Sequence, residues 1–206
     1  MQPDAITDLY YLPSINFFTY LADKKNVLVE ICCRYEKQTG RNRCYLLGAN
    51  QVQRLSIPVI KPLPKQLYAE IRIDYRECWQ NIHWRTICSA YGKAPYFEHY
   101  ADELRRLIYS GEEYLAQLNF KLLTLCLDFL KLSVNISVTD EYLADYGGSI
   151  SDMRGRISYL PTKDYATIRY VQLFGQNFVH NLSVLDLLFC EGPRSIFYLQ
   201  KGCLKQ

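Results

Sequence analysis

The chain lacks any apolar run long enough to cross a membrane. The longest candidate, residues 115–132, is interrupted by polar and charged residues, namely Gln117, Asn119, Lys121, Asp128 and Lys131. The N-terminus also has no basic segment followed by an apolar one, which is the pattern of a secretory signal. We therefore expect no membrane insertion and a cytoplasmic location.

Motifs that would bind a metal ion are lacking too. His99 and His180 have no second histidine or cysteine three or four residues away, and the eight cysteines show no C-x-x-C spacing. Most of the cysteines lie in apolar runs, which is typical of buried free thiols in an intracellular protein. The sequence predicts no metal and no cofactor.

A strong charge of either sign is missing as well. The chain has 24 Lys and Arg against 21 Asp and Glu, which gives a net charge of +3. The cations are spread over the whole length, without the clustered stripe of a nucleic-acid binder. We expect no nucleic-acid partner, whereas an anionic small-molecule substrate is compatible with this charge.

Apolar and aromatic residues, in contrast, are abundant. They include 18 tyrosines, and apolar residues make up 49% of the 206 residues, which excludes a disordered chain. A chain of this length can bury one sizeable core. We predict a single domain over residues 1–206, with 78–132 as a helical subdomain, and the sequence leaves the oligomeric state open.

The first part of the chain predicts a β-α-β unit. Residues 6–12 are expected to form a strand, Ile15, Phe18 and Leu21 the inner face of a short helix, and the apolar run 26–33 a buried strand. A hairpin over 44–47 and 52–57 and a strand over 67–73 should follow. Such units place loops at the carboxyl ends of parallel strands, where ligands bind.

Helices dominate the rest of the predicted structure. Trp79, Ile82, Thr86 and Ala90 share one helix face, and Gly92 and Pro95 predict the end of that helix near residues 90–93. The remaining expected elements are helices over 97–109 and 112–132, strands over 134–138 and 170–174, and a helix that begins at Ser183 and ends at Gly192. The predicted class is α/β, with a β-α-β N-terminal part, a mixed sheet, and a helical middle and C-terminal part.

Two loops gather charged side chains. The first, residues 34–44, brings Arg34, Lys37, Arg41 and Arg43 together around Gly40 and Asn42. Guanidinium groups match the paired oxygens of phosphate and carboxylate, so this loop is a candidate anion site, and the alternative is a solvated charged turn. The second loop follows Gly147 and Gly148 and contains Asp152, Arg154 and Arg156.

Four segments of the chain, YLPSINFF, EKQTGRNRCYL, NIHWRTICSAYGKAPYFEHYADEL and HNLSVLDLLFCEGP, resemble the WbqC-like protein family, in particular its form in Bacteroides-type bacteria. The resemblance implies a role in the biosynthesis of O-antigen and other surface polysaccharides of bacteria. For some members a transfer of a glycyl or similar acyl group to an amino sugar has been suggested. After the second strand the family pattern has polar residues, including a histidine and an acid, where this chain has Cys32 and Cys33.

Acyl transfer to a sugar amine requires a base for the amine proton and a site for the substrate. His83 is the candidate catalytic base, because an imidazole titrates near neutral pH and a helix would hold it rigidly. The alternative is a core histidine that is hydrogen-bonded to the backbone.

The remaining candidate residues would bind the substrate. Arg41 and Arg43 would hold the diphosphate or carboxylate of a nucleotide- or lipid-linked sugar, and Asn42 would bind a sugar hydroxyl. Trp84, Tyr91 and Tyr96 could stack on a sugar or base, although packing is their alternative role. Lys37 and Asp186 complete the set because they stand at family motif positions, and Asp186 could instead belong to the start of its helix.

A second function remains open at this stage. The chain could be a non-catalytic ligand-binding or scaffold protein of a polysaccharide biosynthesis cluster. The enzyme hypothesis predicts a deep pocket in which the cationic loop and His83 converge, whereas the scaffold hypothesis predicts exposed aromatic surface.

Overall fold

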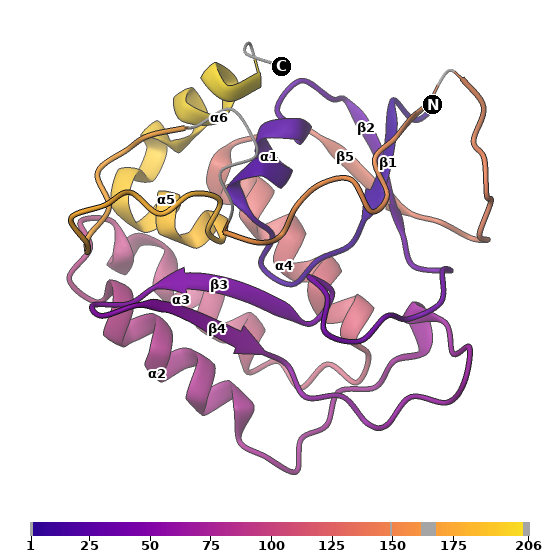
Figure 1. The fold of residues 1–206 in the computed structure, drawn as a ribbon, viewed down its shortest axis with the longest axis horizontal. Helices are drawn as coiled ribbons and strands as arrows, with labels where there is room; N and C mark the ends of the chain where they lie inside the picture. The colour runs from indigo at the N-terminus through magenta and orange to yellow at the C-terminus, as the bar shows by residue number, and fades with distance from the viewer. Residues whose placement is uncertain (1, 149, 162–167, 204–206) are drawn as a thin grey trace.

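The computed structural model describes residues 2–148, 150–161 and 168–203. Its strands form two separate sheets (Figure 1). The larger sheet is parallel throughout and consists, in spatial order, of β5 (Asn135–Val138), β2 (Asn26–Glu30), β1 (Ala5–Asp8) and β6 (Ser151–Asp152). The smaller one is an antiparallel hairpin of β3 (Arg43–Leu47) and β4 (Val52–Ser56). The predicted α/β class is confirmed, and its strands divide into a parallel and an antiparallel sheet.

The β-α-β opening is present, with a shorter first strand than predicted. β1 ends at Asp8 because the chain then turns toward the helix, and Leu12 has a positive φ of 41° that extended backbone does not allow. Helix α1 (Ile15–Leu21) follows Pro13, and all seven of its residues are buried. β2 then pairs in parallel with β1, with Ala5 opposite Val27.

The predicted strand over residues 67–73 is wrong. This segment contains a 3-10 turn, Tyr68–Glu70, in which the Glu70 carboxylate accepts a hydrogen bond from the Leu67 backbone N–H at 3.3 Å. The Tyr68 ring is fully buried and its hydroxyl donates to the Leu9 carbonyl, whereas Leu67 is 38% exposed. The predicted alternation placed Leu67 on the buried face and Tyr68 on the exposed face. In the structure Tyr68 is buried and Leu67 is exposed, so the alternation does not indicate a strand here.

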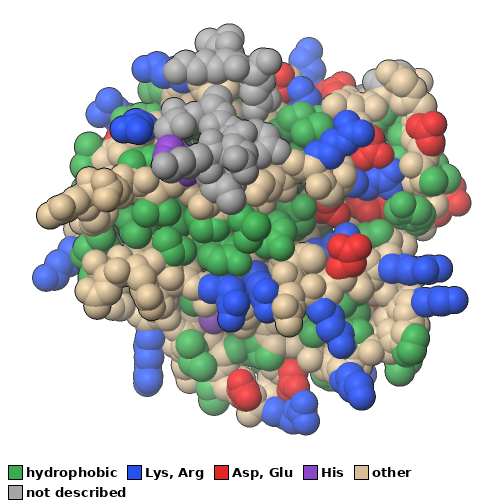
Figure 2. Space-filling view, viewed as in Figure 1, with side chains coloured by type: hydrophobic (Ala, Val, Ile, Leu, Met, Phe, Trp, Pro, Cys, Tyr) green, Lys and Arg blue, Asp and Glu red, His purple; other side chains and the backbone are tan. Residues whose placement is uncertain are grey.

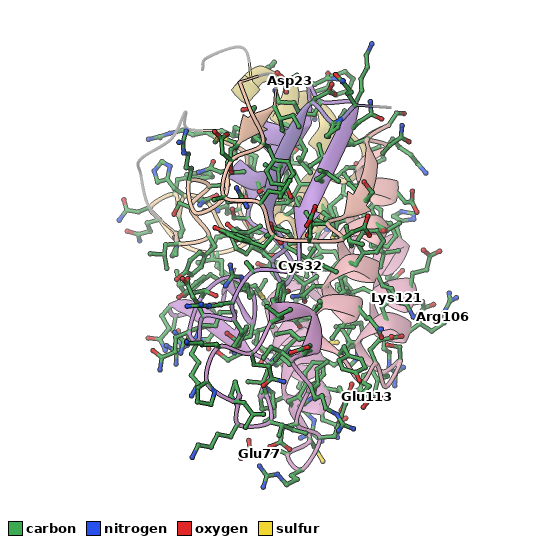
Figure 3. All side chains as sticks on the ribbon, turned by 90° about the vertical axis from the view of Figure 1, so that its right-hand side faces the viewer. Asp23, Cys32, Glu77, Arg106, Glu113 and Lys121 are labelled. Atoms are coloured by element: carbon green, nitrogen blue, oxygen red, sulfur yellow. The ribbon has the colours of Figure 1, made fainter. Side chains whose placement is uncertain are left out.

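Three helices follow at the predicted places, α2 (Trp79–Tyr91), α3 (Phe97–Ile108) and α4 (Leu115–Leu130). The buried face of α2 differs from the predicted face at two positions, because Ile82 is 59% exposed and Thr86 is only partly buried, while His83 and Ile87 are buried. Arg106 on α3 and Lys121 on α4 point away from the body of the molecule (Figure 3).

The C-terminal part contains α5 (Val184–Glu191), a 3-10 turn (Gly192–Arg194) and α6 (Ser195–Cys203). The Ser183 hydroxyl caps α5 by accepting from the Leu185 N–H, as the sequence predicts. The predicted strand over 170–174 is wrong, because side chains hold this segment. Gln172 exchanges two hydrogen bonds with the backbone of Val179, and Tyr170 donates to Asp186.

The order of the parallel strands points to one edge of the sheet as the candidate ligand site. From β1 the chain adds β2 and then β5 on one side, whereas β6 lies on the other side of β1. Strand order therefore reverses between β1 and β6, and ligands of open α/β sheets bind outside the carboxyl ends of the strands at such a point. Figure 3 shows Cys32 at this end of the strands and Asp23 at the opposite end.

The surface gives no sign of a charged stripe on the face shown in Figure 2, where Lys and Arg side chains are scattered between apolar and acidic ones. Among the helices in the described part of the chain, none has the length and apolarity needed to span a bilayer.

Candidate functional site at the strand ends

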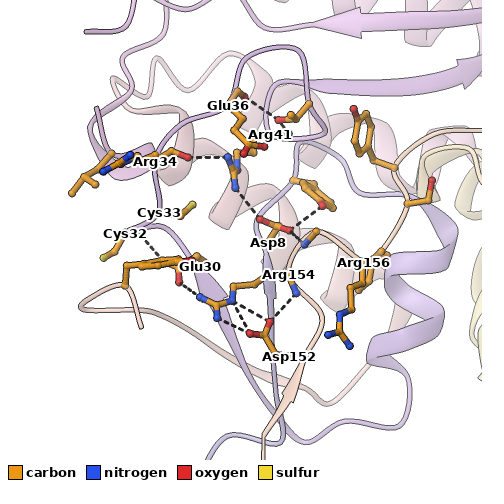
Figure 4. A pocket seen from close by; sticks show the side chains of 18 of the residues that line it. Asp8, Glu30, Cys32, Cys33, Arg34, Glu36, Arg41, Asp152, Arg154 and Arg156 are labelled. Atoms are coloured by element: carbon orange, nitrogen blue, oxygen red, sulfur yellow. Dashed lines mark hydrogen bonds and ion pairs between the residues drawn. The ribbon is translucent and has the colours of Figure 1, made fainter. Parts of the chain in front are cut away.

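A cleft of about 1070 Å³ lies at the carboxyl ends of β1, β2 and β6 (Figure 4). Its lining comes from the last residues of these strands, from the loop over residues 30–41 and from the segment over 152–160. We call it the strand-end cleft. Its volume is at the upper end of the range for small-molecule sites.

Asp8, the last residue of β1, is buried in the floor of the strand-end cleft. Its carboxylate accepts hydrogen bonds from Arg41 Nη2 at 2.9 Å, from the Tyr10 hydroxyl at 3.1 Å and from the Gly155 N–H at 2.6 Å. Gly155 has a φ of +67°, which favours glycine and lets its N–H approach the carboxylate. Asp8 thus ties the loop before β3 and the segment after β6 to the sheet.

Glu30, the last residue of β2, also ties neighbouring segments to the sheet. It is fully buried, and it accepts hydrogen bonds from the Cys32 N–H at 2.7 Å, the Thr139 hydroxyl at 2.9 Å and Arg154 Nη1 at 3.1 Å. Thr139 comes directly after β5 and Arg154 lies two residues after β6, so this one carboxylate connects the carboxyl ends of β2, β5 and β6. A buried charge of this kind requires such partners, because its desolvation is costly.

Arg154 is the most connected cation of the cleft. It forms a forked ion pair with Asp152, donates to Glu30 and to the Leu143 and Ala144 carbonyls, and lies 5.1 Å from the ring centre of Tyr142. Hydrogen bonds from Arg154 lower the pKa of the Asp152 carboxyl. Arg154 therefore fastens the segment before β6 to the edge of the sheet.

Three charged residues of the lining are exposed instead, namely Arg156 and two residues of the loop after β2. Arg34 and Glu36 lie on the loop after β2, and neither side chain has an ion-pair or hydrogen-bond partner within residues 2–148, 150–161 and 168–203. In Figure 4 the Arg34 backbone carbonyl accepts a hydrogen bond from Arg41, the Arg34 guanidinium points away from Arg41, and Glu36 lies on another side of Arg41. Within the strand-end cleft, an incoming ligand can contact these two side chains of the loop without breaking a pair between described residues.

Cys32 and Cys33 also line the strand-end cleft. The Cys32 thiol donates to the Thr139 carbonyl at 3.3 Å, and burial raises the pKa of the Cys33 thiol to about 11. Both cysteines thus face the cleft, and Cys33 is protonated at neutral pH.

Of the residues predicted from sequence to bind substrate, Arg41 lines the strand-end cleft and is 7% exposed. Lys37 lies on the same loop but lines a second cleft of about 580 Å³, together with Tyr35 and Lys61. Asn42 donates to the Ile57 carbonyl at 3.0 Å, and Arg43 donates to the Gln38 carbonyl at 3.2 Å. Asn42 and Arg43 therefore hold the loop and the hairpin and do not line the strand-end cleft.

His83 does not converge with the cationic loop. It is 2% exposed, its Nε2 lies 3.2 Å from the Ser56 carbonyl, and its Nδ1 lies 2.8 Å from the Tyr11 hydroxyl. Because a carbonyl only accepts, Nε2 carries the proton and Nδ1 accepts from Tyr11. Burial lowers the pKa of His83 to about 4, so the imidazole is neutral and engaged at both nitrogens.

The remaining predicted residues also lie outside the strand-end cleft. Trp84 packs on Phe97, and Tyr96 donates its backbone N–H to the Phe189 carbonyl. Tyr91 donates to the fully buried Asp186 at 2.7 Å, and Asp186 accepts from Tyr170 as well. Burial raises the pKa of Asp186, and this cluster joins α2 to α5 inside the core.

The cleft therefore contains charged residues that were not predicted as site residues, namely Asp8, Glu30, Glu36, Asp152 and Arg154, whereas Arg34 belongs to the loop that was predicted as an anion site. A usable signal was present, since Asp8, Glu30 and Asp152 each end a strand of the parallel sheet. This signal was missed because the predicted strands extended beyond Asp8 and Glu30, so these residues were not recognised as strand ends, and because β6 was not predicted.

The structure is that of an α/β protein with a charged cleft at the carboxyl edge of a parallel sheet. The model of the WbqC-like protein family matches residues 9–154 and 151–198, and the chain belongs to this family. It is 28% identical over 231 residues to a Mycobacterium tuberculosis protein described as "Uncharacterized protein Rv1507c", with 97% of this chain and 98% of that protein covered. No solved structure matches the chain.

Proposed function

We propose that the protein is a transferase of surface-polysaccharide biosynthesis, and that it moves a glycyl or other acyl group to the amine of a sugar bound in the strand-end cleft. The observation that carries this proposal is the position of the cleft at the reversal of strand order between β1 and β6. The type of reaction, acyl transfer to an amino sugar, is taken from the family resemblance.

The reaction requires an acyl donor that is activated as a thioester or an acyl phosphate. The amine nitrogen forms a bond to the donor carbonyl carbon, the bond from that carbon to the thiolate or phosphate breaks, and the amine proton passes to cleft water. Arg34 would hold the phosphate of a nucleotide- or lipid-linked sugar, because its guanidinium is exposed in the cleft. Arg41 would orient the loop through its buried pair with Asp8.

The test combines binding and turnover with UDP-glucosamine as the sugar. Calorimetry should detect binding to the wild-type protein, and mass spectrometry should detect sugar that has gained one acyl group from a glycyl thioester. The matched control is Arg85→Gln, an exposed arginine on α2 outside the cleft, against Arg34→Gln inside it. The proposal predicts weaker binding for Arg34→Gln alone, and an absence of sugar binding to the wild type contradicts it.

One observation favours the second candidate, a ligand-binding protein without turnover. Several charged residues of the cleft form ion pairs with one another, namely Arg41 with Asp8 and Arg154 with Glu30 and Asp152. Such paired groups contribute more to a rigid site than to proton transfer. Sugar binding without transfer of an acyl group from any donor would support this candidate over the transferase.

A further inference from the structure

The charges of the strand-end cleft sum to zero, and this balance carries information about the ligand. The lining contains four arginines, Arg34, Arg41, Arg154 and Arg156, and four carboxylates, Asp8, Glu30, Glu36 and Asp152. A site built for a plain polyanion is expected to carry an excess of cations. The charge of the ligand therefore depends on which of these side chains are not already paired within the protein.

Most of these charges are already neutralised within the protein. Arg41 pairs with Asp8, and Arg154 pairs with both Glu30 and Asp152. Arg156 also has a partner and lowers the pKa of the Asp152 carboxyl in addition to Arg154. The ion pairs of Arg41 and Arg154 fix loops to the sheet, and recruiting one of these arginines for a ligand would leave a buried carboxylate without its partner.

Among the charged side chains that line the cleft, one cation and one anion have no ion-pair partner within the described ranges. Arg34 and Glu36 are exposed, line the same cleft and come from the same loop, and their side chains form no ion pair with each other or with another residue of the described ranges. Arg34 and Glu36 are two residues apart on this loop and lie on different sides of Arg41 (Figure 4), so a ligand that spans this end of the cleft can reach both.

We propose that the strand-end cleft binds a zwitterionic ligand, which places a phosphate or carboxylate on Arg34 and an ammonium group on Glu36. This inference rests on the proposed function and narrows its substrate class, since it requires the bound sugar to carry its free amine. A ligand whose amine is already acylated loses the contact with Glu36. The same pair of residues would then distinguish an unreacted acceptor from its product.

The experiment uses three sugar phosphates that differ at one position, glucosamine 6-phosphate, N-acetylglucosamine 6-phosphate and glucose 6-phosphate. Calorimetric titration of the full-length protein should show the free amine binding roughly fivefold more tightly than the other two, which is the size expected for a partly solvated ion pair. Glu36→Gln should remove this difference. Arg34→Gln should weaken all three ligands by a similar factor.

The controls are Glu103→Gln on α3 and Arg85→Gln on α2, which change the same charges on exposed residues outside the cleft. Both should keep the wild-type affinities. Equal affinities for the amine and the N-acetyl sugar in the wild type would overturn the inference, as would a preference that survives in Glu36→Gln.

Failure of this inference can be separated from failure of the proposed function. Binding and acylation of UDP-glucosamine without any dependence on Glu36 would sink the zwitterion assignment alone. A preference for the free amine that depends on Glu36, with no acyl transfer from any donor, would keep the zwitterion assignment and remove the transferase.

Discussion

At the scale of single residues, His83 shows that burial determines what a histidine can do. Its sequence position on a helix suits a general base, yet the Ser56 carbonyl and the Tyr11 hydroxyl occupy both ring nitrogens. Trp79 covers the ring edge-on at 4.9 Å between centroids. A base with a pKa near 4 would remove a proton from an amine only weakly at neutral pH.

The stability of the protein should therefore depend on His83 in a pH-sensitive way. The pKa of His83 is about 4 in the folded chain and 6.5 when unperturbed, so between these values the unfolded state binds the proton more readily. The neutral ring contributes fully above pH 6.5, and its contribution is lost as the pH falls toward 4. We expect the unfolding free energies of wild type and His83→Gln to converge by roughly 2 kcal/mol between pH 7 and pH 5.

Urea unfolding of the two proteins at several pH values measures this convergence, and taking the difference cancels the shared carboxylates. The imidazole nitrogen signals in an NMR titration give an independent value. A His83 pKa near 6.5 in the folded protein would contradict its placement in the core and reopen its role as a base.

At the scale of elements, the segment between β5 and β6 depends on a single side chain. Arg154 donates to the Leu143 and Ala144 carbonyls and, at the same time, to Glu30 at the end of β2. We predict that Arg154→Gln frees residues 141–146 from the sheet edge, because the neutral amide cannot replace this set of hydrogen bonds. Hydrogen exchange followed by mass spectrometry should show faster exchange there, by roughly tenfold or more.

The chain supplies a matched control for this variant. Arg76 forms the same forked pair with Asp74, two residues before it, but its side chain is 84% exposed and lies at the surface. Arg76→Gln should leave the exchange of residues 141–146 unchanged. Equal exchange in wild type and Arg154→Gln would show that packing, and not Arg154, holds the segment.

Elements were predicted well where hydrophobic period and local signals agree. The hairpin, α1, α2, α3, α4 and the β5 strand have clear apolar repeats with turn residues beside them, and all are present within a few residues of their predicted bounds. The strand predictions were wrong where side-chain hydrogen bonds, instead of strand pairing, hold the segment. Tyr68 and Tyr170 each bury a ring and donate a hydrogen bond from its hydroxyl, so short tyrosine-rich segments resemble strands without forming them.

At the scale of the whole molecule, the candidate site was less predictable than the fold. The cationic loop was identified, and Arg41 lies in the cleft, but its partner Asp8 is 33 residues away in sequence. Arg154 and Glu30 are separated by 124 residues. No local pattern reports such pairs, because they form only after parallel strands have brought their carboxyl ends to one edge.

The same reasoning explains why His83, Tyr91 and Asp186 suggested a site. Polar side chains within apolar helices suit a ligand pocket, yet they equally suit a buried network in which each group satisfies another. Tyr91 and Asp186 pair with each other across 95 residues, and only the packing of α2 against α5 reveals it. Family motif positions of this kind report the fold as well as the function.

The central claim, that a sugar ligand occupies the strand-end cleft, is tested most directly by alkylation of the cysteines. Cys32 lines the cleft, whereas Cys78 is exposed and does not, and its neighbour Glu77 lies far from Cys32 in Figure 3. Iodoacetamide labelling followed by peptide mass spectrometry gives both rates in one sample, with Cys78 as the internal control. The account predicts that saturating UDP-glucosamine slows alkylation of Cys32 and leaves Cys78 unchanged, and an unchanged Cys32 rate would contradict it.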